Sequence, residues 1–254
     1  MKLTPFIAAG ALAVLAAPTQ AFVDLPTAGT LRVYGSNNPA SDQLLIAPGT
    51  QTGFDLPFTF DLPANFTLLA SRSTAFELPD EDDPSVFEEV GEFHDAVFRD
   101  ANDGKLVFGS RIVMDLDEEG EINDVFRFGF GGYSAAAAWT FVTSDDLNLF
   151  SAARTLNSNI EDDVDDAFDP DVIGLATDVN VEEDKPLTGW YLIKTDAPGF
   201  ALMADAVGLN QAGEEDQAPY TAYLEGYAPV PVPPAAWLFG TGLVGLARLA
   251  RRKA

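Results

Sequence analysis

Apolar residues along most of this chain occur in short runs, with Gly, Pro, Asn or Asp between them. Short runs rich in Val, Ile, Phe and Tyr and bounded by turn-forming residues predict β-strands rather than helices. The predicted strands are residues 31–34, 43–46, 53–60, 67–72, 93–99, 105–115, 125–130, 135–143, 190–195, 200–209 and 220–227.

Two of these segments lie close enough in the sequence to predict that they pair with each other. Residues 93–99 and 105–115 are separated only by 100–104, a short polar stretch that contains Asn102 and Gly104. Because Asn and Gly tolerate the positive φ angles of tight turns, the two segments predict a β-hairpin.

The segment 125–130 alternates strictly between two kinds of side chain. One side is formed by Phe126, Phe128 and Phe130, and the other by Val125, Arg127 and Gly129. Since successive strand residues point to opposite faces, this alternation predicts a strand buried on one face only.

Helix-forming patterns are scarce in the body of the chain. Ser144 followed by two aspartates could cap a short helix over 144–150, and polar turns at 196–199 and 211–214 separate the last three strands. Many short strands with closely spaced turns predict a mainly β fold, an antiparallel β-sandwich with room for one or two short helices.

The N-terminus has the three parts of a secretory signal peptide. Lys2 supplies a positive start, residues 6–17 form an apolar run, and Thr19-Gln20-Ala21 ends in a small residue. This order predicts a signal peptide over 1–21, removed by signal peptidase after Ala21. We therefore expect the mature chain to begin at Phe22.

The C-terminus combines a proline-rich stretch, an apolar run and a basic end. Pro229, Pro231, Pro233 and Pro234 predict an extended segment, close to polyproline II, that an approaching partner can reach. Residues 235–247 then carry no charge, and their apolar side chains surround the whole predicted helix, which suits lipid more than a protein face. The run is shorter than the about 20 residues of a usual span, yet it predicts a C-terminal transmembrane helix.

This C-terminal stretch resembles the sorting signal of bacterial PEP-CTERM proteins, in a Val-Pro variant. The matching residues are Val230, Pro231, Val232, Pro233, Trp237, Leu238, Phe239, Gly240, Gly242, Leu243, Gly245, Leu246, Arg251, Arg252 and Lys253. The Pro-Glu-Pro tripeptide that names the family is absent, because Val232 stands in place of the acid. The resemblance implies an exported protein that an exosortase, a membrane-embedded transpeptidase, processes, often in connection with extracellular polysaccharide and biofilm.

These ends delimit three parts: a signal peptide at 1–21, an exported β-rich domain at 22–228, and a sorting segment with its transmembrane helix and basic tail at 229–254. The middle part contains all 40 acidic residues but only nine of the 14 Lys and Arg, which gives it a formal charge of −31. Such a body excludes nucleic-acid binding, which needs clustered cations. The basic tail end predicts that the body lies outside the cytoplasmic membrane, since positive residues stay inside.

Acidic loops raise the question of calcium. Asp115, Asp117 and Glu119, followed by Gly120, match the first positions of an EF-hand loop, where hard oxygen ligands converge around a tight turn. The twelfth position is Phe126, which cannot supply the usual bidentate carboxylate. An acidic hairpin loop between two strands is therefore the alternative. A second run, 161–171, contains seven acids and suits either a bridging cation or a solvated loop.

Catalytic patterns are weak. His94 is the only histidine, the chain has no cysteine, and Ser134, which follows Gly132 at the right spacing, lacks the second glycine of a nucleophile elbow. Neighbouring strand residues point to opposite faces, so His94 and Asp95 are not expected to form a dyad. The absence of cysteine also excludes disulfides. We expect no enzymatic activity and no cofactor other than calcium.

Three functional hypotheses follow. The first is an exported cell-envelope or extracellular-matrix protein, anchored in the membrane before processing and then surface-bound or secreted. The second is a carbohydrate-binding module or hydrolase acting on extracellular polysaccharide, which exposed coplanar aromatic rings would favour; Trp139 and Trp190 instead fall in predicted core strands. The third is a calcium-stabilised adhesin.

Overall fold

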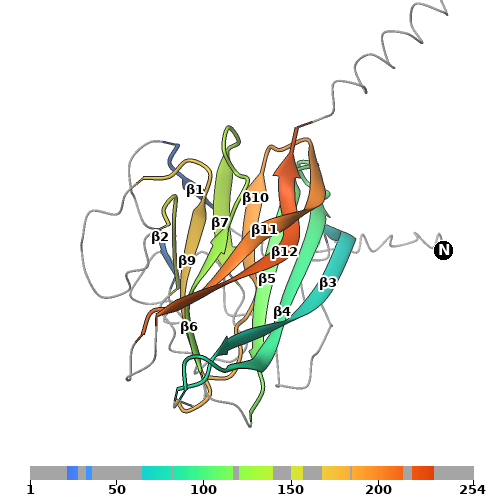
Figure 1. The fold of residues 1–254 in the computed structure, drawn as a ribbon. Coiled ribbons are helices and arrows are strands. Elements are labelled where there is room, and N and C mark those ends of the chain that lie inside the picture. Colours follow the sequence, from blue (N-terminus) through green and yellow to red (C-terminus); the bar gives the residue numbers. More distant parts are fainter. Residues whose placement is uncertain are drawn as a thin grey trace, which may run out of the picture.

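Among the described residues, twelve strands form two antiparallel sheets that pack face to face as a β-sandwich (Figure 1). The computed structural model describes residues 22–27, 33–35, 65–81, 83–116, 120–139, 150–156, 168–183, 185–213 and 219–231. In spatial order, the first sheet contains β1 (Val23–Leu25), β7 (Ala135–Trp139), β10 (Tyr191–Thr195), β5 (Leu106–Met114), β4 (Phe87–Asp100) and β3 (Phe66–Pro79). The second contains β12 (Tyr220–Val230), β11 (Gly199–Gln211), β6 (Glu121–Arg127), β9 (Ile173–Asn180), β8 (Phe150–Ala153) and β2 (Val33–Gly35). The predicted antiparallel sandwich is confirmed.

The predicted hairpin is also confirmed. β4 and β5 pair from Arg99 opposite Leu106 to Gly91 opposite Met114. Gly104 has a φ of +73°, and its N–H donates to the Asp100 carbonyl at 2.7 Å. β4 is longer than expected because it pairs with β3 from Asp100 back to Phe87, opposite Pro79, beyond the last pair with β5 at Gly91.

The acidic loop after β5 does not form a hairpin, so the acidic hairpin expected as the alternative to a calcium site is wrong. β5 belongs to the first sheet and β6 to the second, so the chain between Met114 and Glu121 crosses from one sheet to the other. Gly120 has a φ of +132°, a conformation that favours glycine just before β6 begins.

β6 is buried along its whole length, so the expectation of a strand buried on one face was wrong. Phe126 lies between Gly208 of β11 and Gly174 of β9, and its atoms come within about 3.5 Å of where their missing Cβ atoms would be. The two glycines leave room for Phe126 to lie close against the backbones of both neighbouring strands, and it is buried there. The alternation also stops early: β6 ends at Arg127, and Phe130 then turns inward to pack against Phe108 at 5.4 Å between ring centroids.

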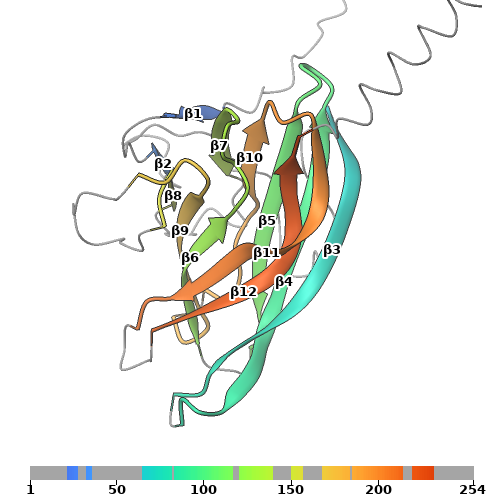
Figure 2. The same ribbon diagram turned by 45° about the horizontal axis from the view of Figure 1, so that its top comes forward.

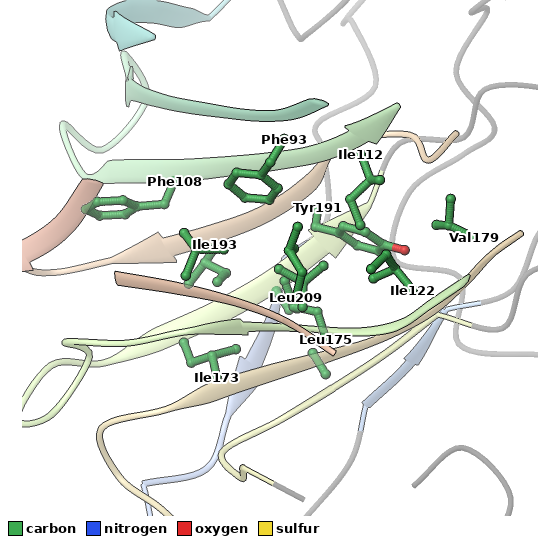
Figure 3. Packing of buried hydrophobic residues seen from close by; sticks show 14 of the residues in the cluster. Phe93, Phe108, Ile112, Ile122, Ile173, Leu175, Val179, Tyr191, Ile193 and Leu209 are labelled. Atoms are coloured by element: carbon green, nitrogen blue, oxygen red, sulfur yellow. The ribbon is translucent and has the colours of Figure 1, made fainter. Parts of the chain in front are cut away.

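The core fills the space between the two sheets (Figure 3). Its members alternate along their strands, and the largest come from both sheets: Phe93, Phe108, Ile112, Tyr191 and Ile193 from the first, and Ile122, Ile173, Leu175, Val179 and Leu209 from the second. Full burial of one such side chain stabilises by roughly 1.5–3 kcal/mol. The core therefore holds the sandwich together without disulfides.

Three strands, β1, β8 and β9, were not predicted. β9 contains Gly174, Thr177, Asp178 and Asn180, a composition that weakens any strand pattern. Of the predicted helix at 144–150, only Phe150 lies within the described residues, and it begins β8. The predicted strands at 43–46 and 53–60 lie outside them.

Candidate functional site: the end of the sandwich where β12 stops

The end of the sandwich where β12 stops is defined by the strand registers, and we call it the exit end. Val230 lies opposite Gly199 at the start of β11, only a short turn beyond Thr195 at the end of β10. Phe66 and Asp100 pair at the same end of the first sheet. Figure 2 shows β12 running to this end beside β11 and β3.

The opposite end of the molecule, which we call the far end, is also set by register. Pro79 pairs there with Phe87, and Gln211 with Tyr220. The Phe87 and Tyr220 rings meet edge to face at 5.1 Å and join the two sheets. The two ends can therefore be compared directly.

β12 is tied to the rest of the sandwich by a buried ion pair. Arg127 Nη1 donates to Asp95 Oδ1 at 2.9 Å and to Ser110 Oγ at 2.7 Å, while its Nη2 donates to the Tyr227 carbonyl at 2.5 Å. The Tyr227 N–H donates in turn to Asp95 Oδ2 at 2.6 Å. Both backbone groups of Tyr227 are thus held by side chains from the two sheets. We call these four residues the β12 clamp.

The β12 clamp depends on Gly226 and on the opposite charges of Asp95 and Arg127. A Cβ on Gly226 would lie 2.9 Å from Asp95 Oδ2 and 2.7 Å from a Val207 methyl, so only glycine lets β12 approach this closely. Burial raises the pKa of Asp95, and the Arg127 guanidinium and the Tyr227 N–H oppose that rise. Removing one partner of such a pair leaves an uncompensated buried charge, which costs about 3–5 kcal/mol.

The predicted sorting segment starts inside this strand. Pro229 pairs with Phe200 and Val230 with Gly199, so the open polyproline stretch expected from position 229 is wrong for these two residues. Pro229 is tolerated because β12 is an edge strand. Pro231 is exposed directly after the strand. The other sorting residues, from Val232 to Lys253, lie outside the described residues.

Phe22 is the first described residue and lies at the exit end. Its ring packs against Phe66 at 6.4 Å, and the Lys194 ammonium sits 4.4 Å from its centroid. Lys194 pairs with Asp100, whose carboxylate also accepts from Asn65 at 2.7 Å. Burial acts to raise the pKa of Asp100, but the hydrogen bonds from Lys194, the Asn102 N–H and Asn65 hold it below its usual value. The predicted cleavage residue, Ala21, lies outside the described residues.

Two acids of the 161–171 run have structural partners. Asp171 Oδ1 accepts from the Gly131 N–H at 2.9 Å, and Asp169 accepts from the Asp171 N–H at 2.9 Å. Nearby, buried Arg154 donates to the carbonyls of Pro170 at 2.6 Å and Tyr133 at 2.7 Å. Burial lowers the pKa of Arg154, and Asp171 opposes that shift. These groups fasten the link between β6 and β7 at the exit end.

The calcium hypothesis stays a prediction. Asp115 follows β5, and its N–H donates to the Val90 carbonyl at 2.9 Å, whereas Asp117 and Glu119 lie outside the described residues. Within the part of the chain that the structure describes, no three His, Asp or Glu side chains are grouped to hold a metal ion.

Among the described residues, the candidate side chains for catalysis or carbohydrate binding do not meet in one site. Asp95 faces Arg127, while His94 Nε2 lies 3.7 Å from Glu92, so these neighbours have separate partners as predicted. Burial lowers the pKa of His94, against the Glu92 charge. Trp190 is buried edge-on against Phe98, and the Trp139 side chain lies outside the described atoms. Exposed Tyr223 is tilted 41° from Phe128 rather than coplanar with it.

Sequence reasoning missed the β12 clamp. Its trace in the sequence is one charged residue inside each of two short, mostly apolar runs, Asp95 within 93–98 and Arg127 within 125–130. No family model, curated protein or solved structure matches this chain. No helix among the described residues is long and apolar enough to cross a bilayer. The predicted span at 235–247 lies beyond them.

Proposed function

We propose that this chain is an exported cell-envelope or extracellular-matrix protein that its C-terminal tail holds in the membrane until an exosortase-type enzyme processes it. One observation carries the proposal: β12 is fixed to the core at Tyr227 and ends at Val230. The chain therefore passes from a rigid strand into the Val-Pro segment with no long linker between them. Such a junction places the start of the segment, Val230 and exposed Pro231, at the surface of the body.

The N-terminal end supports the same proposal. Cleavage after Ala21 would make Phe22 the first residue of the mature chain. The Phe22 ring packs on Phe66 beneath the Lys194 ammonium, so the expected cleavage site keeps this contact in the mature body. Export and folding are then compatible.

We assign the buried charged groups to structure rather than to catalysis. Arg127 and Asp95 bind each other and the backbone of β12, and Arg154 binds backbone carbonyls. These contacts use the groups to join sheets and loops. We therefore propose that the body has no enzymatic role and serves as a protein of the cell surface or the extracellular matrix.

The test is mass spectrometry of both termini of the protein recovered from its native host, with and without the exosortase. We expect Phe22 at the N-terminus in both strains, a C-terminus shortened near Val230–Pro233 when the enzyme is present, and an intact Ala254 when it is deleted. Replacing Pro231 and Pro233 by alanine should leave membrane insertion intact and prevent the shortening. An intact Ala254 on surface protein in the host that has the enzyme would contradict processing.

A further inference from the structure

The distance between the body and the predicted membrane segment is short. Only Pro231, Val232, Pro233 and Pro234 separate the end of β12 from the uncharged run that starts at Ala235. Four extended residues span at most about 12–14 Å. The polar interface of a bilayer is itself about 5–7 Å thick on each side. If 235–247 enters the bilayer, the exit end must lie at the lipid surface.

Four exposed apolar side chains lie at this end on β11 and β3, the two strands that contact β12 here. Leu202 and Met203 of β11 are 47% and 44% exposed, and Leu68 and Leu69 of β3 are 43% and 39% exposed. Leu202 lies opposite Tyr227. We call these four side chains the exit patch.

The exit patch is uncovered for a topological reason. β6 pairs with β11 only from Val207 onward, so the first half of β11 has β12 as its single strand neighbour. β3 is the edge strand of the first sheet, and β12 contacts it across the sandwich. An ion pair between Arg72 and Glu225, at 2.6 Å, joins these two edges just beyond the patch.

Charge differs between the two ends of the β3–β4 hairpin. The far half of the hairpin carries only acids among its described charged side chains: Glu77, Asp80, Glu81, Asp83, Glu88, Glu89 and Glu92. The cations Arg99, Lys105 and Lys194 lie at the exit end, where Arg99 donates to the Gly104 carbonyl at 2.7 Å. Lys194 pairs there with Asp100 and Asp103, so the exit end of the hairpin carries charges of both signs whereas its far half is acidic throughout.

We propose that the exit end is a membrane-contacting surface: the exit patch meets the lipid interface and the far end points away from it. Apolar side chains gain by entering the interface, and the cations of the exit end offset the acids beside them, so this end lacks the uniform negative charge of the far end. The acidic far end is repelled from the same headgroups. This inference rests on the proposed membrane anchor and adds to it the face of the body that the anchor brings to the lipid.

The absence of cysteine makes the test direct, because each labelled site needs only one substitution. Chains of residues 22–254 carrying Leu202→Cys or Leu68→Cys are labelled with an environment-sensitive fluorophore and reconstituted into vesicles of phosphatidylethanolamine and phosphatidylglycerol. The controls are Val86→Cys and Phe87→Cys, which are 44% and 43% exposed at the far end. We expect headgroup nitroxide lipids to quench the exit-end labels at least about twofold more than the controls, with a blue-shifted emission.

Vesicle flotation tests the membrane anchor separately from the membrane-contacting surface. The 22–254 chain should float with the vesicles, and a chain ending at 231 should not. If 22–254 floats and all four labels are quenched alike, the membrane-contacting surface is wrong while the anchor stands. If 22–254 does not float, both are wrong. Two labelled sites at each end keep the comparison valid if one variant fails to fold.

Discussion

The two ends of the described fold are attached to the sandwich in different ways. β12 is an eleven-residue strand whose Tyr227 is held by a fully buried ion pair from both sheets. β1 is a three-residue strand, preceded by a half-buried Phe22 that rests on Phe66 and Lys194. The C-terminal attachment therefore uses a buried ion pair between the sheets, whereas the N-terminal one uses a short edge strand that places Leu25 in the core. This difference suits the anchoring through the C-terminus that we propose.

The largest effect should come from shortening β12 through the clamp. A body of residues 22–226 loses Tyr227 and with it the partners of Asp95 and Arg127 on this strand. We expect it to be less stable than 22–231 by at least about 3–5 kcal/mol in urea unfolding, because buried polar groups lose their partners.

A body ending at 228 is the matched control for that truncation. It keeps Tyr227 and loses only the pairs that Pro229 and Val230 make with β11, so it should lose about 1 kcal/mol. If 22–226 and 22–228 unfolded at the same urea concentration, Tyr227 would not be the attachment point.

Breaking the ion pair from its other side should give the next largest effect. Arg127→Met leaves Asp95 buried without its counter-charge, and we expect a loss of about 3–5 kcal/mol, or roughly 10 °C in melting temperature for a body of this size. Arg72→Ala, which removes the more exposed pair with Glu225, should cost no more than about 1 kcal/mol. Equal losses in the two variants would show that the clamp adds nothing beyond a surface pair.

The N-terminal attachment should contribute less. Phe22→Ala removes a half-buried ring, its contact with Phe66 and the overlying Lys194 ammonium, and we expect a loss of about 1–2 kcal/mol in thermal or urea unfolding. Phe22→Leu should recover part of that loss by restoring apolar area without the ring. A Phe22→Ala loss as large as that of Arg127→Met would remove the contrast between the two ends.

Acid should weaken the N-terminal attachment through Asp100. Its pKa is held below the ordinary 3.8 in the folded state. The unfolded chain therefore binds more protons between the two pKa values, and the stability that Asp100 contributes is present above about pH 4 and is lost as pH falls through the folded pKa. Stability measured against pH should show a smaller acid loss in Asp100→Asn than in the unchanged body. Parallel curves would mean that Lys194 does not stabilise this carboxylate.

Local patterns were enough to predict the elements that close within a few residues. The turn at 100–104 gave the β4–β5 hairpin, since Gly104 itself takes the positive φ that the turn needs. They were not enough for β6, because its burial depends on Gly208 and Gly174, which come from strands far away in sequence. They also failed for the loop after β5, since an acidic turn looks the same whether the next strand joins the same sheet or the opposite one.

By itself, the sequence determined a mainly β body of strongly acidic charge, set between an apolar start and a Pro-rich, apolar and basic end, because composition and periodicity are local properties. Only the tertiary structure decided that Pro229 and Val230 belong to the last strand, where pairing with Phe200 and Gly199 overrides the tendency of prolines toward an open extended chain. It also decided which charges are buried together. Arg127 reaches Asp95 and Tyr227 from 32 and 100 residues away, a distance over which no sequence pattern acts and only the packing of the two sheets can bring partners into contact.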